Sequence, residues 1–431
     1  MRHWIQRARR CGSGVRPRRA AAGAGCLLAA VTGALGCGGD GAAAASSAGG
    51  SATRYFRLVQ YPRAGFRGFY GQIAHARRTI DMEMYELEDP VAERDLAAAA
   101  ARGVRVRVML DRDFSGARAN RGAARYLAGH GVAVRWAPAG YIFHIKATTF
   151  DGTTSDISTA NLVSRYYRTT RDAEIVDRDP SQVRAIAATF RNDWAAAPGG
   201  DPRTQTVQAP GLVWSPNTGS GTAQGALVRE LRRARRTVDF ESEELSDPAI
   251  YRALAADARR GVRCRIVMTR SSEWDTAFRA VSRAGCHVHL FPDSSTALYI
   301  HEKLILDDGG TAHASLLIGS QNASVTSLTR NRELGILLRR AHGGARAIAT
   351  AGATFGADYR HAAPWSTPTP TPPPSPPPAP APAGCHPRTS SGHCYEPGEY
   401  CSDADHGIRG VAGDGELIVC RDDDGWRWER R

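Results

Sequence analysis

The stretch HIKATTFD at His144–Asp151 returns later in the chain as HEKLILDD at His301–Asp308. Each copy has a histidine, a lysine two residues later and an aspartate five residues after the lysine. These lysines, Lys146 and Lys303, are the only two in a chain of 431 residues with 56 basic side chains. Because arginine serves every general need for positive charge here, a retained lysine indicates a chemical role. Residues i and i+2 of a strand face one side, so each motif is predicted to set an imidazole beside an ammonium, which suits an anion.

Both motifs belong to an internal repeat of about 158 residues. The sequence ARRTIDMEMYELEDP at Ala76–Pro90 returns as ARRTVDFESEELSDP at Ala234–Pro248, with ten of fifteen positions identical. A period this long is the size of a domain and not of a solenoid repeat. We therefore predict two tandem copies of one fold, at residues 54–205 and 206–362.

Within each copy, strand patterns alternate with helix patterns. VRVRVML in the first copy and VRCRIVM in the second alternate apolar with other residues, as half-buried strands do, while VAERDLAAAAARG is typical of a helix ending at a glycine. This alternation predicts an α/β fold, with a parallel or mixed sheet flanked by helices on both faces. The histidine motifs follow the apolar stretches YIF and LYI, so we expect them on or beside central strands.

Residues 1–53 have the layout of an export signal followed by a flexible linker. An arginine-rich start precedes an apolar run, and ALGC at Ala34–Cys37 resembles a bacterial lipobox, which makes Cys37 the predicted site of lipid attachment. Cleavage in the alanine run that follows and an uncleaved membrane anchor are the alternatives. We expect a secreted protein, held to the outer face of the cytoplasmic membrane if Cys37 is acylated. The formal net charge of +13 falls to +7 without the first fifty residues, so the remainder is only mildly basic.

The C-terminal part differs from the repeat in composition. Residues 363–383 form a proline-rich linker, and residues 384–431 a small cysteine-rich module that needs disulfides to fold. Its four cysteines predict two disulfide bonds with three alternative pairings: Cys385, Cys394, Cys401 and Cys420. Cys264 and Cys286 are either a buried thiol pair or a third bridge. The tryptophans of the final GWRWERR are interpreted as a module core, with a sugar, wall or membrane contact as the alternative.

Each histidine motif is followed at a matched distance by an asparagine and then by a carboxylate: Asn161 and Glu174 in the first copy, Asn322 and Glu333 in the second. Together these features resemble the phospholipase D superfamily over about residues 54–362. The resemblance implies two halves related by a pseudo-twofold axis, joined in one monomer that needs no partner copy. It also implies phosphodiester cleavage through a phosphohistidine, without a metal or another cofactor.

The resemblance assigns roles to the motif residues. His144 is the expected nucleophile and His301 the acid and base, while Glu174 and Glu333 would each orient a histidine. The expected phosphate-binding residues are Lys146, Asn161, Lys303 and Asn322. Asp151 and Asp308 are expected to secure local structure. The complete predicted catalytic set is His144, Lys146, Asp151, Asn161, Glu174, His301, Lys303, Asp308, Asn322 and Glu333.

The first copy departs from the family's glycine-serine turn, because Ser158-Thr159 stands where the second copy has Gly319-Ser320. Thr159 keeps a hydroxyl, so we expect altered tightness and retained catalysis. The acidic blocks DMEMYELED and DFESEELSD are interpreted as sheet-end or interface structure rather than calcium sites.

The motifs define a reaction class and leave the substrate open. Our leading hypothesis is hydrolysis of phospholipid head groups at a membrane surface. The second hypothesis is a nuclease acting on DNA or RNA, which the basic net charge favours. A phosphatidyltransferase of the cardiolipin-synthase type comes third, and a surface-binding protein with an inactive site is the alternative outside enzymology.

Overall fold

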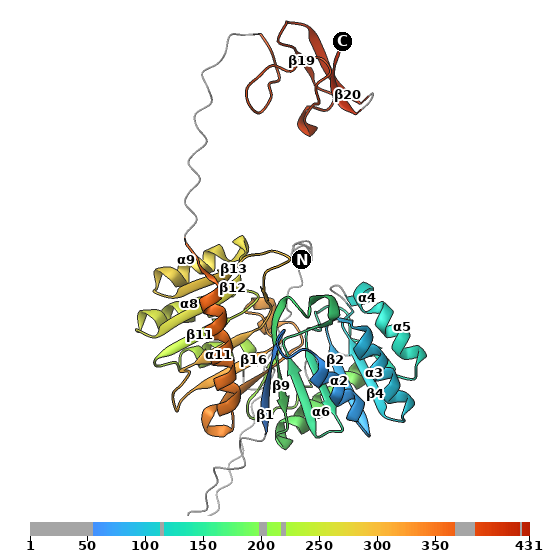
Figure 1. Cartoon of the computed structure of the whole chain (residues 1–431), viewed down its shortest axis with the longest axis vertical. Helices are drawn as coiled ribbons and strands as arrows, with labels where there is room; N and C mark the ends of the chain where they lie inside the picture. Colours follow the sequence, from blue (N-terminus) through green and yellow to red (C-terminus); the bar gives the residue numbers. More distant parts are fainter. Residues whose placement is uncertain (1–54, 113–115, 198–204, 217–220, 367–383, 423–424) are drawn as a thin grey trace, which may run out of the picture. The chain divides into compact units, whose positions relative to one another are not determined.

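The computed structural model describes residues 55–112, 116–197, 205–216, 221–366, 384–422 and 425–431. These residues belong to two compact units, which divide between Ser366 and Thr367 (Figure 1). The predicted export signal, Cys37 and most of the proline-rich linker lie outside the described residues. In the part of the chain that is described, no helix combines the length and apolar character needed to cross a bilayer.

The first unit contains two sheets with the same strand order, so the sequence repeat is also a structural repeat. The first sheet runs β1 (Phe56–Tyr61), β9 (Thr170–Asp177), β7 (Thr154–Ser158), β6 (Lys146–Phe150), β2 (Thr79–Met84), β4 (Arg105–Leu110) and β5 (Ala133–Trp136). The second runs β10 (Leu212–Ser215), β17 (Glu333–Arg339), β16 (Ser315–Gly319), β15 (Leu304–Asp307), β11 (Thr237–Glu241), β12 (Arg263–Thr269) and β13 (His287–Phe291), with β18 (Ala363–Pro364) at its edge. In both, the β2–β4–β5 or β11–β12–β13 side is parallel and the other side antiparallel. This confirms the predicted mixed sheets, with each motif at the start of a central strand.

Three helices cover the outer face of each sheet. They are α2 (Arg67–His75), α3 (Pro90–Ala101) and α5 (Arg121–Gly129) in the first half, and α7 (Ala223–Leu231), α8 (Pro248–Arg259) and α9 (Asp275–Arg283) in the second. Helices α3 and α8 begin alike because Asp89 and Asp247 accept backbone N–H bonds at the N-cap and proline stands at N1. The shorter elements are α4 (Gly116–Ala119), α10 (Val325–Thr329), β3 (Leu87–Glu88), β8 (Leu162–Val163) and β14 (Tyr299–Ile300).

One continuous apolar core joins the two halves. Its buried side chains come from the inner faces of both sheets and from the long helices α6 (Pro180–Ala196) and α11 (Ala345–His361), including Phe190 and Phe355. The backbone also crosses between the halves, because β14 of the second half pairs in parallel with β9 of the first. In return Phe143 forms a parallel bridge with Arg332. The two halves therefore fold as one body around a shared layer.

Two ion pairs, one fully buried and one partly buried, cross the same layer in reciprocal fashion. Arg332, which directly precedes β17, makes two hydrogen bonds, of 2.8 and 3.0 Å, to the carboxylate of Asp193 on α6. Arg171 on β9 makes two bonds, of 2.6 and 2.8 Å, to Asp358 on α11. Bidentate geometry of this kind fixes orientation as well as charge. Each half is thus bound to the other through one arginine. In both cases the next residue carries a carboxylate, Asp172 after Arg171 and Glu333 after Arg332.

The C-terminal unit is a three-stranded antiparallel sheet of β19 (Arg409–Val411), β20 (Leu417–Asp422) and β21 (Trp426–Arg430). Disulfides join Cys385 to Cys394 and Cys401 to Cys420, which selects one of the three alternative pairings. Trp428 is fully buried in the small core of this unit, so that tryptophan is structural.

A third disulfide bond lies in the second half of the repeat and joins Cys264 on β12 to Cys286, directly before β13. This pair is therefore a bridge and not a buried thiol pair.

Candidate active site

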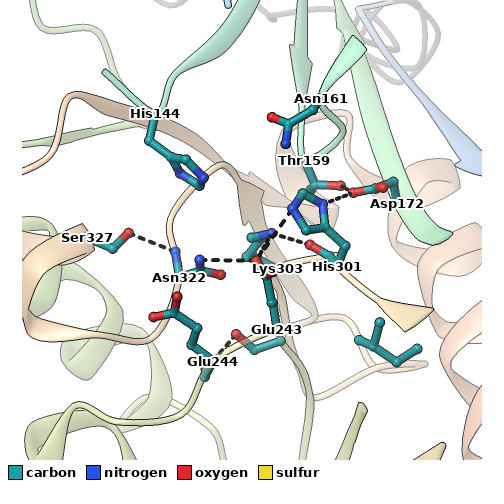
Figure 2. A network of polar contacts seen from close by, with 12 residues as sticks. His144, Thr159, Asn161, Asp172, Glu243, Glu244, His301, Lys303, Asn322 and Ser327 are labelled. Atoms are coloured by element: carbon teal, nitrogen blue, oxygen red, sulfur yellow. Dashed lines mark hydrogen bonds and ion pairs between the residues drawn. The ribbon is translucent and has the colours of Figure 1, made fainter. Parts of the chain in front are cut away.

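His144 and His301 line one pocket of about 400 Å³ at the junction of the two halves. Both side chains point toward the same space in Figure 2, although the residues are separated by 157 positions in the chain. Both are mostly buried, at 8 and 9 % exposure. A pocket of this size accommodates a small ligand or a head group.

Each histidine is held by the opposite half, through its backbone and its ring. The His144 N–H donates to the carbonyl of Arg332 at 2.9 Å, and its Nδ1 donates to Glu333 at 2.8 Å. The His301 N–H donates to the carbonyl of Arg171 at 3.0 Å, and its Nδ1 donates to Asp172 at 2.7 Å. A carboxylate on Nδ1 fixes the tautomer, so that Nε2 is the nitrogen left to do the chemistry. Neither half contains a complete site.

The expected role of Glu174 is wrong, because Asp172 orients His301. Glu174 lies two residues further along β9, where its carboxyl accepts a hydrogen bond of 3.1 Å from the Tyr61 hydroxyl. Burial raises the pKa of Glu174 to about 7, which disfavours the charged form that a protonated imidazole needs as a partner. The prediction matched glutamate with glutamate, whereas the fold matches Arg171-Asp172 with Arg332-Glu333. The offset of 161 residues that relates Asn161 to Asn322 also relates these two dipeptides, and would have identified Asp172.

Further hydroxyl groups support the two carboxylates. Thr159 Oγ1 donates to Asp172 at 2.6 Å, and Ser327 Oγ on α10 donates to Glu333 at 2.6 Å. The threonine that departs from the family's turn therefore takes part in positioning His301. At the equivalent turn of the second half, a Cβ on Gly319 would lie 2.3 Å from the Cα of Gly335, so only glycine fits between those strands.

The surroundings of His144 favour its neutral form. Burial, together with the charges of Lys146 and Lys303, lowers the pKa of His144 to about 4, although Glu333 opposes the shift. Burial alone would raise the pKa of Glu333, but the adjacent His144 and Lys146 lower it. His144 is therefore an unprotonated imidazole at neutral pH, with its Nδ1 proton directed at a carboxylate. This is the state that a nitrogen nucleophile requires.

The motif lysines lie behind their histidines and support them. Lys146 and Lys303 are 1 and 4 % exposed, and each Nζ donates to the carbonyl of its own motif histidine. Lys146 also lies 5.0 Å from the centre of the Tyr85 ring. Burial lowers the pKa of Lys146 to about 7, because a buried ammonium lacks hydration. Each ammonium therefore fixes the backbone of a motif and supplies positive potential to the pocket.

The asparagines face the pocket from opposite halves, and each binds a carboxylate from an acidic block. Asn161 Nδ2 donates to Glu86 at 3.1 Å, and Asn322 Nδ2 donates to Glu243 at 3.2 Å. The acidic blocks thus contribute side chains to the pocket, beyond the structural role expected for them. Among the described residues, no three histidine, cysteine, aspartate or glutamate side chains converge as metal ligands would.

Asp151 and Asp308 have the local structural role predicted for them. Asp151 accepts the backbone N–H groups of Arg77, Arg78 and Thr79, at 2.7–3.2 Å, and its pKa is lowered by these bonds although burial opposes the shift. Asp308 accepts the equivalent groups of residues 235–237. Both aspartates have a positive φ, of 53° and 51°, so each ends its motif in a left-handed turn that caps the neighbouring strand.

The pocket wall is aromatic and acidic, which the sequence did not predict. Seven aromatic residues contribute to it: Tyr61, Phe66, Tyr85, Tyr166, Tyr167, Trp274 and Tyr299. Five carboxyl groups line it as well: Glu86, Asp172, Glu243, Glu244 and Glu273. Burial and the charge of Glu243 raise the pKa of Glu244 to about 7. These residues come from strands, short helices and loops that are far apart in the chain, so no local sequence signal brings them together.

Comparison with known proteins agrees with this geometry. The family model described as "Cardiolipin synthase, PLD-like domain" matches residues 70–194 and 227–351, together more than half of the chain. No curated protein matches the chain significantly. The solved structure of phosphatidylserine synthase from Haemophilus influenzae Rd KW20 is similar in fold, with a TM-score of 0.53 and 11% identity over 72% of this chain and 87% of that one.

Two further solved structures are similar over smaller parts. Polyphosphate kinase from Porphyromonas gingivalis has a TM-score of 0.49 and 15% identity over 66% of this chain, which spans only 48% of that kinase. Nuc from Salmonella typhimurium, a phospholipase D family member, has a TM-score of 0.31 and 22% identity over 32% of this chain and 93% of its own length. With both halves matched by the family model and both motifs in one pocket, the chain belongs to the phospholipase D superfamily, as a member with two fused PLD-like halves.

Proposed function

We propose that the protein is an exported phospholipase D, which hydrolyses the head-group phosphodiester of membrane phospholipids without a metal. The observation that carries the proposal is the reciprocal arrangement of the histidines. Each exposes Nε2 to one shared pocket while Nδ1 is bound to a carboxylate of the other half. Such a pair suits a two-step displacement at one phosphorus atom.

In the first step, Nε2 of His144 attacks phosphorus and the bond to the head-group oxygen breaks. His301 gives its Nε2 proton to that oxygen, so the head group leaves as a neutral alcohol. In the second step, His301 takes a proton from water, whose oxygen displaces His144 and yields phosphatidic acid. Glu333 and Asp172 stabilise the positive charge that each imidazole acquires. Lys146, Lys303 and the two asparagines supply positive charge and N–H donors for the phosphate oxygens.

The pocket wall favours a phospholipid over a nucleic acid. Five carboxyl groups line it, which would repel the successive phosphates of a DNA or RNA strand. Aromatic faces next to carboxylates instead suit a head group that carries an ammonium. The three disulfide bonds support an oxidising, extracytoplasmic location, in agreement with the proposed export and lipid anchor at Cys37.

A phosphatidyltransferase is the second candidate, favoured by the description of the matching family model. It would use the same phosphohistidine and replace water with an alcohol. The products separate the candidates. We would incubate the mature protein in EDTA with phosphatidylcholine vesicles, with phosphatidylglycerol vesicles and with plasmid DNA.

Release of choline and phosphatidic acid supports the hydrolase. Conversion of phosphatidylglycerol into cardiolipin supports the transferase, and strand cleavage supports the nuclease. His144→Ala is the control, and it should abolish whichever activity is found while leaving the thermal unfolding midpoint within a few degrees. If the wild-type protein leaves all three substrates intact, the proposal is wrong.

A further inference from the structure

One oxygen of Glu243 lies close to two of the groups that we assign to the substrate phosphate and to the histidine nitrogen that we assign as acid and base. Lys303 Nζ lies 2.9 Å from Glu243 Oε2, Asn322 Nδ2 lies 3.2 Å from it, and His301 Nε2 lies 3.4 Å from it. Figure 2 shows these groups converging on the carboxylate between the two histidines. A non-bridging phosphate oxygen would need the same donors. The carboxylate therefore occupies an anion position in the second half of the site.

Glu243 is charged in this position. Burial would raise its pKa, but the adjacent Lys303 and His301 lower it far below the usual range. Its second oxygen accepts a hydrogen bond of 3.0 Å from the Tyr299 hydroxyl. A partly buried carboxylate, 19 % exposed, with four polar contacts is a bound internal anion, and a phosphate that takes its donors must displace it.

The first half differs at the corresponding sequence position, although Glu86, the next residue, contacts Asn161 at 3.1 Å there. In the repeat, Glu243 corresponds to Tyr85, which follows the same strand nine residues after the shared alanine. The Tyr85 ring lies edge-on to the His144 ring at 4.7 Å, and Lys146 Nζ lies 5.0 Å from its centre. An aromatic ring attracts a cation without competing for N–H donors as an anion does. Lys303 therefore contacts a carboxylate, whereas Lys146 lies over an aromatic ring.

We propose that Glu243 occupies the phosphate subsite of the second half until substrate displaces it, and that it thereby selects phosphodiesters that carry a cation over purely anionic ones. A zwitterionic lipid replaces the broken ion pair between Lys303 and Glu243 with two new ones. Its phosphate pairs with Lys303, and its ammonium pairs with the displaced carboxylate of Glu243. An anionic phosphodiester leaves that partly buried carboxylate without a cation, which is costly. The selectivity part of this inference rests on the proposed function, whereas the displacement part requires only that the site binds an anion.

The displacement is tested by the affinity of the full-length protein for inorganic phosphate, measured by titration calorimetry at pH 8. We expect Glu243→Gln to bind phosphate at least tenfold more tightly than the wild type, because glutamine keeps the shape and removes the competing charge. Glu244→Gln is the matched control. It removes a carboxylate from the same pocket that is largely charged at this pH but makes none of the three contacts, so we expect less than a threefold change.

Equal or weaker phosphate binding by Glu243→Gln, or no binding by either protein, would overturn the displacement. If this variant does not fold, Glu243→Tyr serves instead, because it copies the residue of the first half.

The selectivity is tested by kcat/KM on phosphatidylcholine and phosphatidylglycerol vesicles. We expect Glu243→Gln to lower the ratio of choline lipid to glycerol lipid at least tenfold, and an unchanged ratio would refute it. A wild-type protein inactive on both lipids would sink the proposed function, while the phosphate titration would still decide the displacement.

Discussion

Two dipeptides, Arg171-Asp172 and Arg332-Glu333, organise the active site at the scale of single residues. In each, the arginine side chain binds an aspartate of the opposite half, its carbonyl accepts a histidine N–H, and the following carboxylate binds that histidine's Nδ1. Three contacts from two residues fix the position, tautomer and orientation of one imidazole. The chemistry therefore depends on residues outside the lysine-containing motifs.

The assignment of Asp172 leads to a direct mutational prediction. We expect Asp172→Asn to lower kcat by about 10²- to 10⁴-fold, because an amide can hold the wrong tautomer and cannot stabilise the imidazolium. Glu174→Gln removes a carboxyl from the same strand without touching His301, so its cost should be at most a few-fold. Steady-state kinetics on phosphatidylcholine measures both. A larger loss for Glu174→Gln than for Asp172→Asn would return the orienting role to Glu174.

The lowered pKa of Lys146 predicts a pH dependence. Below about pH 7 its ammonium is charged and attracts the substrate phosphate, and above that pH the charge is progressively lost. We expect kcat/KM to fall as pH rises through this region, since kcat/KM reports the free enzyme. In Lys146→Arg the side chain stays charged, so the fall should move to higher pH even if the maximum rate is lower. Lys146→Met, uncharged at every pH, is the control, and an unmoved fall in the arginine variant would assign it to another group.

At the scale of elements, the repeat predicted the fold class, the mixed sheets and the central place of the motif strands. It did so because the alternation of β2, α3 and β4 is local and is written twice, as β11, α8 and β12. The pairing of β14 with β9 and the bridge between Phe143 and Arg332 could not be predicted, since both join residues that are far apart in the chain. The error at Glu174 has another cause: its identity matched the family pattern, but the 161-residue offset of the repeat relates Asp172, and not Glu174, to Glu333.

The ion pairs between the halves predict a large stability effect. Arg332 and Asp193 are fully buried, so removing one partner leaves an uncompensated charge in the shared core. We expect Asp193→Ala to lower the free energy of unfolding by about 3–5 kcal/mol. It should also lower activity, because Arg332 precedes Glu333 and its carbonyl holds His144. Denaturant unfolding with kinetics on the same samples provides the measurement, with the exposed Asp414→Ala as the control.

A change below about 1 kcal/mol in Asp193→Ala would mean that this ion pair adds little to the apolar core and the backbone pairs that join the halves. The reciprocal variant Asp358→Ala removes the partner of Arg171 and should act on His301 in the same way. We expect a smaller loss of stability in Asp358→Ala, because the Arg171 side chain is 12 % exposed whereas that of Arg332 is fully buried.

At the scale of the whole molecule, duplication has produced one active site and not two. Each half supplies one histidine and the carboxylate for the other half's histidine, so the halves depend on one another. The symmetry is broken by Glu243, which replaces the Tyr85 of the first half, and by the separate carboxylates Asp172 and Glu333. These differences allow two equivalent positions to take the unequal roles that we propose, with a neutral His144 as nucleophile and His301 as acid and base.

The most direct test of this account is to trap the covalent intermediate and locate it. The substrate would be a phosphatidyl ester with a leaving group acidic enough to depart without a proton, and the protein would be His301→Ala, which lacks the base for hydrolysis. After an alkaline quench, peptide mass spectrometry should find the phosphatidyl adduct on His144, together with a burst of one equivalent of leaving group. An adduct on any other residue, or the same burst from the His144→Ala/His301→Ala double variant, would contradict the shared two-histidine site.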